Sequence, residues 1–148
     1  EFEGGPTLQF DPRYLGTVRI DSQKITRAIL NLARNAKEAL RGNARGSAPI
    51  VGTVTIRIDA DEAADTVLFE VEDDGPGIPD GIRATLFDPF VTHGKRDGTG
   101  LGLAIVKNIA EQHEGSITFV TGGKGTTFRI TVPRAGPQRG AVPALAHP

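Results

Sequence analysis

The spacing of apolar residues along the N-terminal third changes from strand-like to helical. Two short β-prone runs, Thr7–Phe10 and Thr17–Ile20, are separated by a Pro- and Gly-containing turn, which predicts two strands. From Ser22 the apolar positions recur every three or four residues, which predicts a helix with one buried stripe. Asp21 or Ser22 can cap this helix and Gly42 can end it. The stripe contains Ile25, Ala28, Ile29, Leu32, Ala33, Ala36, Ala39 and Leu40.

The middle of the chain alternates apolar and polar residues with a period of two. After a small, polar loop over 43–49, the runs 54–58 and 67–71 predict two half-buried strands, joined as a hairpin by the acidic turn Asp59–Asp65. The next segment, Asp73–Pro79, contains glycines and prolines that break a strand ladder, which predicts a loop.

Helical spacing returns in the last third. Gly100–His113 predicts a second helix that stops at Gly115, and the runs 116–120 and 126–132 predict a closing hairpin. The polar segment Val91–Thr99 has few residues with which to pack itself down, so we expect a mobile loop. The Pro-, Gly- and Ala-rich residues 134–148 have no periodicity, which predicts a disordered tail after a domain over residues 1–133.

Composition narrows the class of protein. The 148 residues include no cysteine, which excludes disulfide scaffolds, cysteine-based zinc sites and thiol nucleophiles. Seventeen basic and eighteen acidic residues give a net charge of −1, so nucleic acid and membrane surfaces are unfavoured partners. Because no apolar run approaches a membrane span and the N-terminus lacks the pattern of a signal peptide, we expect a cytoplasmic domain. The absence of an initiating Met and the Glu1-Phe2 opening suggest a piece of a longer protein.

A glycine-rich run opens the second predicted helix, with the sequence Gly98-Thr99-Gly100-Leu101-Gly102-Leu103. Glycines at a helix N-terminus let backbone N–H groups approach an anion, and the helix dipole favours negative charge there. The run predicts phosphate binding, with a tight loop as the alternative. It matches neither the P-loop nor the dinucleotide spacing, and Lys124 is followed by Gly125 rather than Ser or Thr.

Two further elements carry polar groups next to apolar ones. Asp73 ends a predicted strand and is followed by Gly75 and Gly77, which allow a flat group to approach the backbone. An adenine amine would supply the donor that a buried carboxylate needs, whereas a simple β-turn is the alternative. Asn31 and Asn35 lie four residues apart on one helix face, where their carbonyl oxygens suit Mg²⁺ or bond neighbouring backbone.

In this order, the elements resemble the ATP-binding catalytic domain of sensor histidine kinases, within the superfamily that includes DNA gyrase. The resemblance covers about residues 7–133 and implies the Bergerat fold, an α/β two-layer sandwich with a mixed, mostly antiparallel sheet and helices on one face. The matching motifs are Asn31–Ala39 as the N box, Glu72–Pro79 and Gly98–Leu103 as glycine boxes, Leu86–Phe90 as the F box and Gly123–Phe128 as the last glycine segment.

The resemblance implies roles for individual residues. Asp73 would bind the adenine amine beside Gly77 and Thr126, and Asn35 would coordinate Mg²⁺ with Asn31 near the phosphates. The remaining residues expected around ATP are Gly75, Ile78, Gly98, Thr99, Gly100, Leu101, Gly102 and Leu103, with Lys95 and Arg96 meeting phosphate charge in the lid and Phe87 and Phe90 anchoring that lid.

One position separates subclasses of this superfamily. In its hydrolases a Glu that serves as base stands four residues before the metal-binding Asn, and here that position is Asn31. Asn cannot usefully accept a proton near neutral pH, which favours phosphoryl transfer to histidine over activation of water. Glu38 departs from the pattern of many histidine kinases, which carry Lys at this position. Lys37 or Lys95 then becomes the candidate for the positive charge that this Lys would supply.

The phosphoacceptor histidine of such kinases lies on a separate dimerisation domain, and none of His93, His113 and His147 fits its motif. We therefore expect a monomeric ATP-binding domain that does not phosphorylate itself. Its partners would be a histidine-bearing dimerisation domain and, downstream, a response regulator. The alternatives are a non-catalytic nucleotide-sensing or docking module of the same fold and, less favoured because of Asn31, an ATPase of this superfamily.

Overall fold

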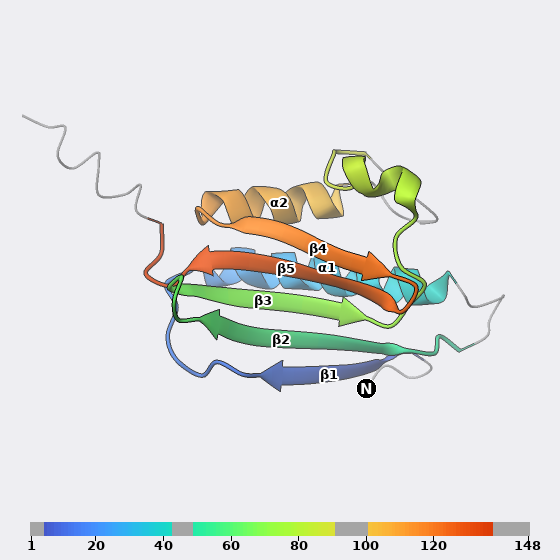
Figure 1. Ribbon diagram of the computed structural model, residues 1–148, viewed down its shortest axis with the longest axis horizontal. Helices are drawn as coiled ribbons and strands as arrows, with labels where there is room; N and C mark the ends of the chain where they lie inside the picture. The colour runs from blue at the N-terminus through green and yellow to red at the C-terminus, as the bar shows by residue number, and fades with distance from the viewer. Residues whose placement is uncertain (1–4, 43–48, 91–100, 138–148) are drawn as a thin grey trace, which may run out of the picture.

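The chain forms one mixed sheet with its helices on a single face (Figure 1). A computed structural model describes residues 5–42, 49–90 and 101–137. The sheet order is β1-β2-β3-β5-β4; β1 is parallel to β2 and the other pairs are antiparallel, which confirms the predicted fold class. The elements are β1 (Thr7–Pro12), α1 (Ser22–Arg41), β2 (Thr53–Asp61), β3 (Thr66–Asp73), a 3-10 helix η1 (Asp80–Thr85), α2 (Gly102–Gln112), β4 (Ser116–Gly122) and β5 (Gly125–Pro133).

Helix α1 forms where the apolar period predicted it. The side chain of Asp21 accepts a hydrogen bond from the Lys24 backbone N–H at 3.1 Å, so Asp21, rather than the alternative Ser22, is the N-cap. Gly42 ends the helix in a right-handed conformation, with its N–H bonded to the Glu38 carbonyl. The helix buries Ile25, Ala28, Leu32, Ala36 and Leu40.

The second strand predicted near the N-terminus is wrong. Residues 17–20 are not part of the sheet; there Arg19 donates its backbone N–H to the Arg134 carbonyl at 2.9 Å. The reason is topological. Because β1 pairs in parallel with β2, the chain must cross over to the opposite end of the sheet, and α1 makes that crossing after the connecting segment that contains residues 17–20.

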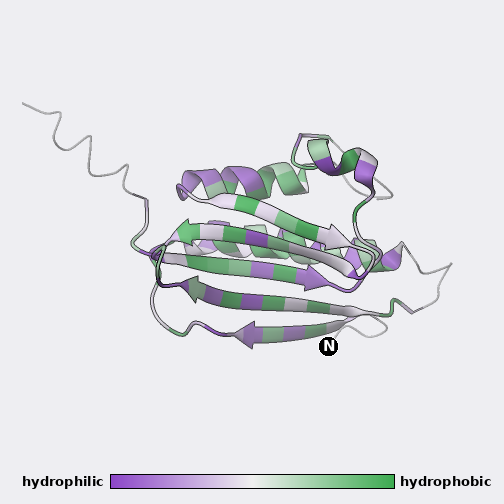
Figure 2. Cartoon of the chain, viewed as in Figure 1, coloured by the Kyte–Doolittle hydropathy of each residue, from purple (hydrophilic) through white to green (hydrophobic). Residues whose placement is uncertain are grey.

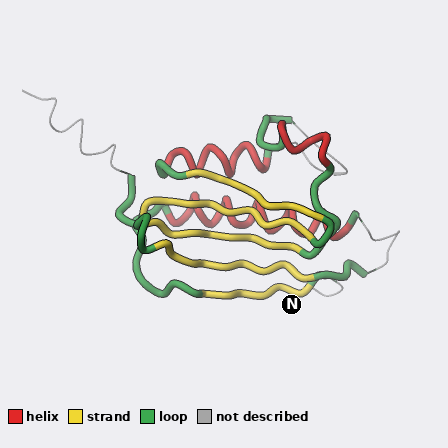
Figure 3. Tube along the Cα trace, viewed as in Figure 1, coloured by secondary structure: helices red, strands yellow, loops and turns green. Residues whose placement is uncertain are grey.

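The core lies between the sheet and the helices. On β3, Val67, Phe69 and Val71 face the helices and are buried, whereas the alternate residues face the other side. The same alternation is visible along β5 and β2 (Figure 2). The helices and the sheet thus form the two layers seen in the Cα trace (Figure 3).

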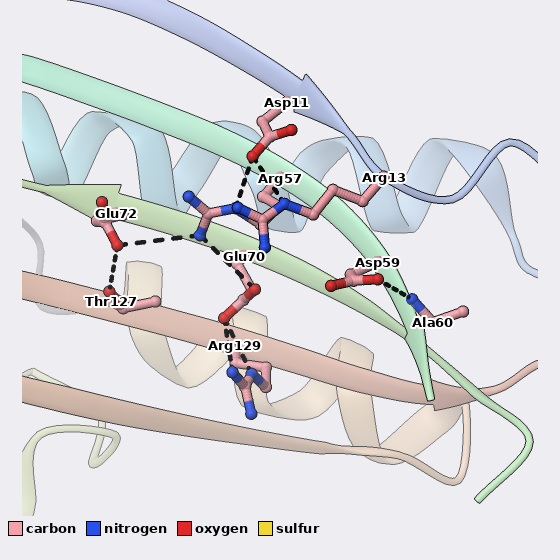
Figure 4. A network of polar contacts seen from close by, with 9 residues as sticks. All are labelled: Asp11, Arg13, Arg57, Asp59, Ala60, Glu70, Glu72, Thr127 and Arg129. Atoms are coloured by element: carbon pink, nitrogen blue, oxygen red, sulfur yellow. Dashed lines mark hydrogen bonds and ion pairs between the residues drawn. The ribbon is translucent and has the colours of Figure 1, made fainter. Parts of the chain in front are cut away.

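The face of the sheet opposite the helices carries a row of alternating charges. Asp11, Arg57, Glu70 and Arg129 stand side by side on β1, β2, β3 and β5 (Figure 4). Arg57 Nε lies 3.0 Å from Asp11 Oδ2, and Arg129 Nη2 lies 2.8 Å from Glu70 Oε2. The hydrogen bond from Arg57 holds the pKa of Asp11 below its ordinary value. These pairs cover Glu70, which is only 6% exposed.

His113 has a structural role. It is 4% exposed at the end of α2, where its Nδ1 lies 2.8 Å from the Ile109 carbonyl. Its Nε2 accepts the backbone N–H of Asp21 at 3.0 Å, so the ring is neutral and carries its proton on Nδ1. The ring therefore connects the start of α1 to the end of α2.

Residues 134–137, which the sequence assigned to the tail, lie within the described part of the chain. The backbone N–H of Arg134 bonds the Asp65 carbonyl at 3.0 Å, and Gly136 is buried. The domain boundary at residue 133 and the disorder of the tail stay predictions. No helix in the described ranges is long and apolar enough to cross a bilayer.

We expect the substitution His113→Phe to lower the free energy of unfolding by about 1–3 kcal/mol, because it keeps the ring but leaves the Asp21 N–H without its acceptor. Urea denaturation of the chain measures this change. Gln112→Ala, at the exposed end of the same helix, is the matched control and should change the stability by less than about 0.5 kcal/mol. Equal stabilities of the wild type and His113→Phe would contradict the structural role of His113.

Candidate functional site

Asp73 is a buried carboxylate at the end of the central strand. It is the last residue of β3, it is 5% exposed, and it pairs in register with Thr126 on β5. Its Oδ1 accepts the backbone N–H of Gly75 at 2.9 Å. The side chain faces the helices, in the same direction as Val71 and Phe69.

Burial raises the pKa of Asp73 above its ordinary value, and the backbone N–H groups of Gly75 and Thr126 act in the opposite direction. The negative charges of Asp74 and Glu72 raise it further. Two N–H groups leave a carboxylate with spare lone pairs, so Asp73 can accept a further hydrogen bond from a neutral amine.

The loop after β3 lies tightly against the turn between β4 and β5. Gly77 has a φ of 84°, and a side chain there would overlap the Gly122 carbonyl. Gly125 has a φ of 129°, and a side chain there would overlap the Asp73 carbonyl. These two glycines therefore allow three backbone segments to meet at the end of the sheet.

Thr121 on β4 is a site residue that the sequence interpretation missed. The Ile78 backbone N–H donates to Thr121 Oγ1 at 2.8 Å, and Thr121 Oγ1 lies 2.8 Å from Thr126 Oγ1. A signal was present in the alternation of β4, where Ile117, Phe119 and Thr121 share the face toward the helices.

Helix α1 carries Asn31 and Asn35 one turn apart on the same face. Both residues are half-buried, and Asn35 Nδ2 is fully enclosed. The C-terminal turn of α1 lies next to the loop after β3, since a side chain at Gly75 would contact Leu40 and Ala39. The predicted N box and the first glycine box are therefore neighbours.

The amide of Asn35 fits an Mg²⁺ ion whose other bonds are made mainly by a bound ligand. Among residues 5–42, 49–90 and 101–137, no cluster of three acidic, histidine or cysteine side chains is arranged to hold a metal. Mg²⁺ is commonly bound by one or two protein oxygens together with substrate phosphates. The half-buried amide of Asn35 is suited to such a role, and its assignment as a metal ligand stays a prediction.

The two phenylalanines of the predicted F box differ in the structure. The Phe87 ring packs 5.9 Å from the Phe119 ring and 6.3 Å from the Phe128 ring, so it fixes the segment after η1 to the sheet. Phe90 is 75% exposed with a φ of 66°, and its expected role in anchoring the lid stays a prediction.

Part of the predicted phosphate region lies outside the described residues, namely Lys95, Arg96, Gly98, Thr99 and Gly100, as do His93 and His147. Helix α2 begins at Gly102 with Leu101 before it, and Leu103 packs against the core. Among the described residues, none would lie within 4 Å of a side chain at Gly102.

An open hollow of about 510 Å³ lies at the opposite end of the sheet. It is lined by Thr17, Val18, Arg19, Asp65, Arg134 and Ala135. Because Arg134 pairs with Asp65 at 2.6 Å, its charge is already compensated there. The polar groups that lie close together, Asp73, Thr126 and Thr121, are at the other end of the sheet.

Comparison with known proteins defines the class. Residues 20–136 match the family described as histidine kinase-, DNA gyrase B- and HSP90-like ATPases, and the chain belongs to this family. Its relatives include the sensory histidine kinase/phosphatase NtrB of Rhodobacter capsulatus, 37% identical over 85% of this chain and 36% of the relative. The C4-dicarboxylate transport sensor protein DctS of the same organism is 41% identical over 84% of this chain and 18% of the relative.

Solved structures agree with this assignment. Full-length ShkA in complex with AMPPNP superposes with a TM-score of 0.74 at 29% identity, over 91% of this chain and 27% of that one. The catalytic domain of histidine kinase ThkA superposes with a TM-score of 0.74 at 27% identity, over 90% of this chain and 83% of that one. The chain is thus similar to the ATPase domains of sensor histidine kinases, and it spans about a third or less of the curated relatives' length.

We expect Asp73→Asn to change stability in a pH-dependent way. A carboxyl whose pKa is raised by folding favours the folded state at low pH, and this contribution is lost as the pH rises through the raised pKa. The amide of the variant is neutral throughout, so the stability of the variant relative to wild type should be higher at pH 7 than near pH 4. Urea denaturation between about pH 4 and 8 measures the trend. A relative stability that does not vary with pH would contradict the raised pKa.

Proposed function

We propose that this chain binds ATP with Mg²⁺ and supplies the γ-phosphoryl group to a histidine on a separate dimerisation domain. The observation that carries the proposal is the buried Asp73 at the end of β3, with a further hydrogen bond to accept. The AMPPNP complex of ShkA supports the ligand class, because AMPPNP is an analogue of ATP.

Adenine fits the Asp73 end of the site chemically. Its exocyclic amine is a neutral donor for the Asp73 carboxylate, while Gly75 and Gly77 keep the surrounding backbone free of side chains. The triphosphate would then extend toward the start of α2, where the helix dipole favours negative charge.

Asn35 would hold Mg²⁺ through its amide oxygen, with Asn31 one turn earlier beside the phosphates. Bound Mg²⁺ would neutralise phosphate charge during transfer. Lys95 and Arg96 are proposed to contribute positive charge to the phosphates. The domain contributes binding, orientation and charge compensation, and the attacking imidazole comes from the partner.

Asn31 supports transfer to histidine rather than hydrolysis. An amide cannot take a proton from water near neutral pH, so the position holds no general base. A histidine imidazole is itself nucleophilic when neutral and has no need of strong activation. The proposed downstream partner is a response regulator, and we propose a cytoplasmic location for this domain and a monomeric state for the isolated chain.

The substitution Asp73→Asn should weaken binding of an ATP analogue by about 10- to 150-fold, because it removes a charge-assisted hydrogen bond of about 1.5–3 kcal/mol. Isothermal titration calorimetry with AMPPNP and Mg²⁺ measures the affinity. Glu111→Gln, which neutralises an exposed acid on α2, is the control and should bind like wild type. Unchanged affinity of Asp73→Asn would refute the adenine assignment.

The chain alone should show negligible ATP hydrolysis, because Asn31 cannot serve as a general base, and no phosphohistidine, because its own histidines do not match an acceptor motif. With radiolabelled ATP and the purified dimerisation domain of the same kinase, label should appear on that domain. An acceptor whose reactive histidine is replaced by glutamine should stay unlabelled. Rapid hydrolysis by the chain alone would count against the interpretation of Asn31.

A further inference from the structure

Two hydrogen-bonded threonine hydroxyls form a relay beside Asp73. Thr121, Thr126 and Asp73 lie in register on the adjacent strands β4, β5 and β3, all facing the helices. The Ile78 N–H donates to Thr121 Oγ1 at 2.8 Å, and the two threonine oxygens are 2.8 Å apart. Thr126 is 4% exposed, so little water is available to replace these bonds.

Cooperativity between the hydrogen bonds favours one direction for the hydroxyl protons. A threonine hydroxyl has one proton and two lone pairs. An amide N–H can only donate, so the bond from Ile78 uses one lone pair of Thr121. Accepting that bond polarises the Thr121 hydroxyl and makes it a better donor. Thr121 is therefore the favoured donor in its bond to Thr126.

We propose that Thr121 is a positioning residue that directs the Thr126 hydroxyl proton toward the base of the bound nucleotide. This inference rests on the proposed ATP-binding function. When Thr126 accepts from Thr121, its own proton remains for an acceptor in the site. Thr121 also fixes the loop after β3 through its hydrogen bond to the Ile78 N–H. The loop is close to Thr121 at the preceding residue too, because a side chain on Gly77 would come within 3.1 Å of Thr121 Oγ1.

The relay has a consequence for base selectivity. With the relay in place, Asp73 presents an acceptor and Thr126 a donor, side by side on neighbouring strands. Adenine offers the complementary pair, an amine donor beside a ring-nitrogen acceptor. Hypoxanthine reverses both groups, with a carbonyl acceptor beside a ring N–H donor. A site built to bond one pattern rejects the reversed one because its own groups are left unpaired.

The test compares Thr121→Val, which removes the hydroxyl but keeps the branched shape, with Thr121→Ser, which keeps the hydroxyl. Thr118→Val is the matched control, because Thr118 lies on β4 but faces away from the helices. Calorimetry uses the analogues of ATP and ITP in which an NH group replaces the β–γ bridging oxygen, and it gives the ratio of the affinities for the adenine and hypoxanthine nucleotides. For Thr121→Val we expect this ratio to fall about 3- to 10-fold through weaker adenine binding. Thr121→Ser and Thr118→Val should keep the wild-type ratio.

Amide hydrogen exchange at Ile78 gives an independent readout. Exchange should accelerate in Thr121→Val, where the N–H has lost its acceptor, and stay slow in Thr121→Ser. A wild-type affinity ratio in Thr121→Val would overturn the positioning role, as would a ratio that falls equally in Thr121→Ser. If Thr121→Val does not fold, the ratio in Thr121→Ser decides, and a fall there overturns the proposal. Failure of the proposed function is distinct, because the wild-type chain would then bind neither analogue.

Discussion

The pairing of β3 with its two neighbours is the constraint on which the rest of the structure depends. One face of β3 contributes Val67, Phe69 and Val71 to the core, and the opposite face contributes Glu70 to the charge row. The strand ends at Asp73, beside Thr126. Core packing, surface charge and the candidate site therefore all depend on a single register.

The buried carboxylate of Asp73 illustrates how function opposes stability in this domain. Enclosing an ionisable group costs free energy, and the raised pKa of Asp73 reports that cost. The backbone N–H groups of Gly75 and Thr126 recover only part of it. A ligand that donates to Asp73 would recover more, so ligand binding and folding stability are coupled through this residue.

Local periodicity determined the parts of the fold that the sequence could predict. The stripe of α1 and the alternation of β2, β3 and β5 reflect burial against one partner layer, and the Asp21 cap reflects a local hydrogen bond to the helix backbone. Residues 17–20 carry β-prone side chains, yet the crossover between parallel strands decides their conformation. Local propensity contains no information about that crossover.

The candidate site likewise contains residues that the sequence could predict and residues that it could not. The motifs identified Asp73, Gly77 and Thr126, which the structure brings together, because each stands in a short run with distinctive composition. Thr121 was missed because a threonine in a strand is common and its importance depends on a bond to Ile78, 43 residues away. Phe87 packs against the sheet whereas Phe90 is exposed, and the sequence of two nearby aromatic residues does not reveal this difference in direction.

The charge row on the open face distinguishes the native register from its nearest competitor. A strand that slips by two residues keeps its apolar side chains toward the helices, so hydrophobic burial hardly opposes such a slip. A slip of β3 in one direction would place Leu68 between Arg57 and Arg129 and leave both without a carboxylate, whereas a slip in the other direction would place Glu72 there but bring Glu70 opposite Asp59. Ion pairs that contribute little to overall stability can thereby exclude a misfolded sheet with an intact core, in which Asp73 and Thr126 would no longer meet.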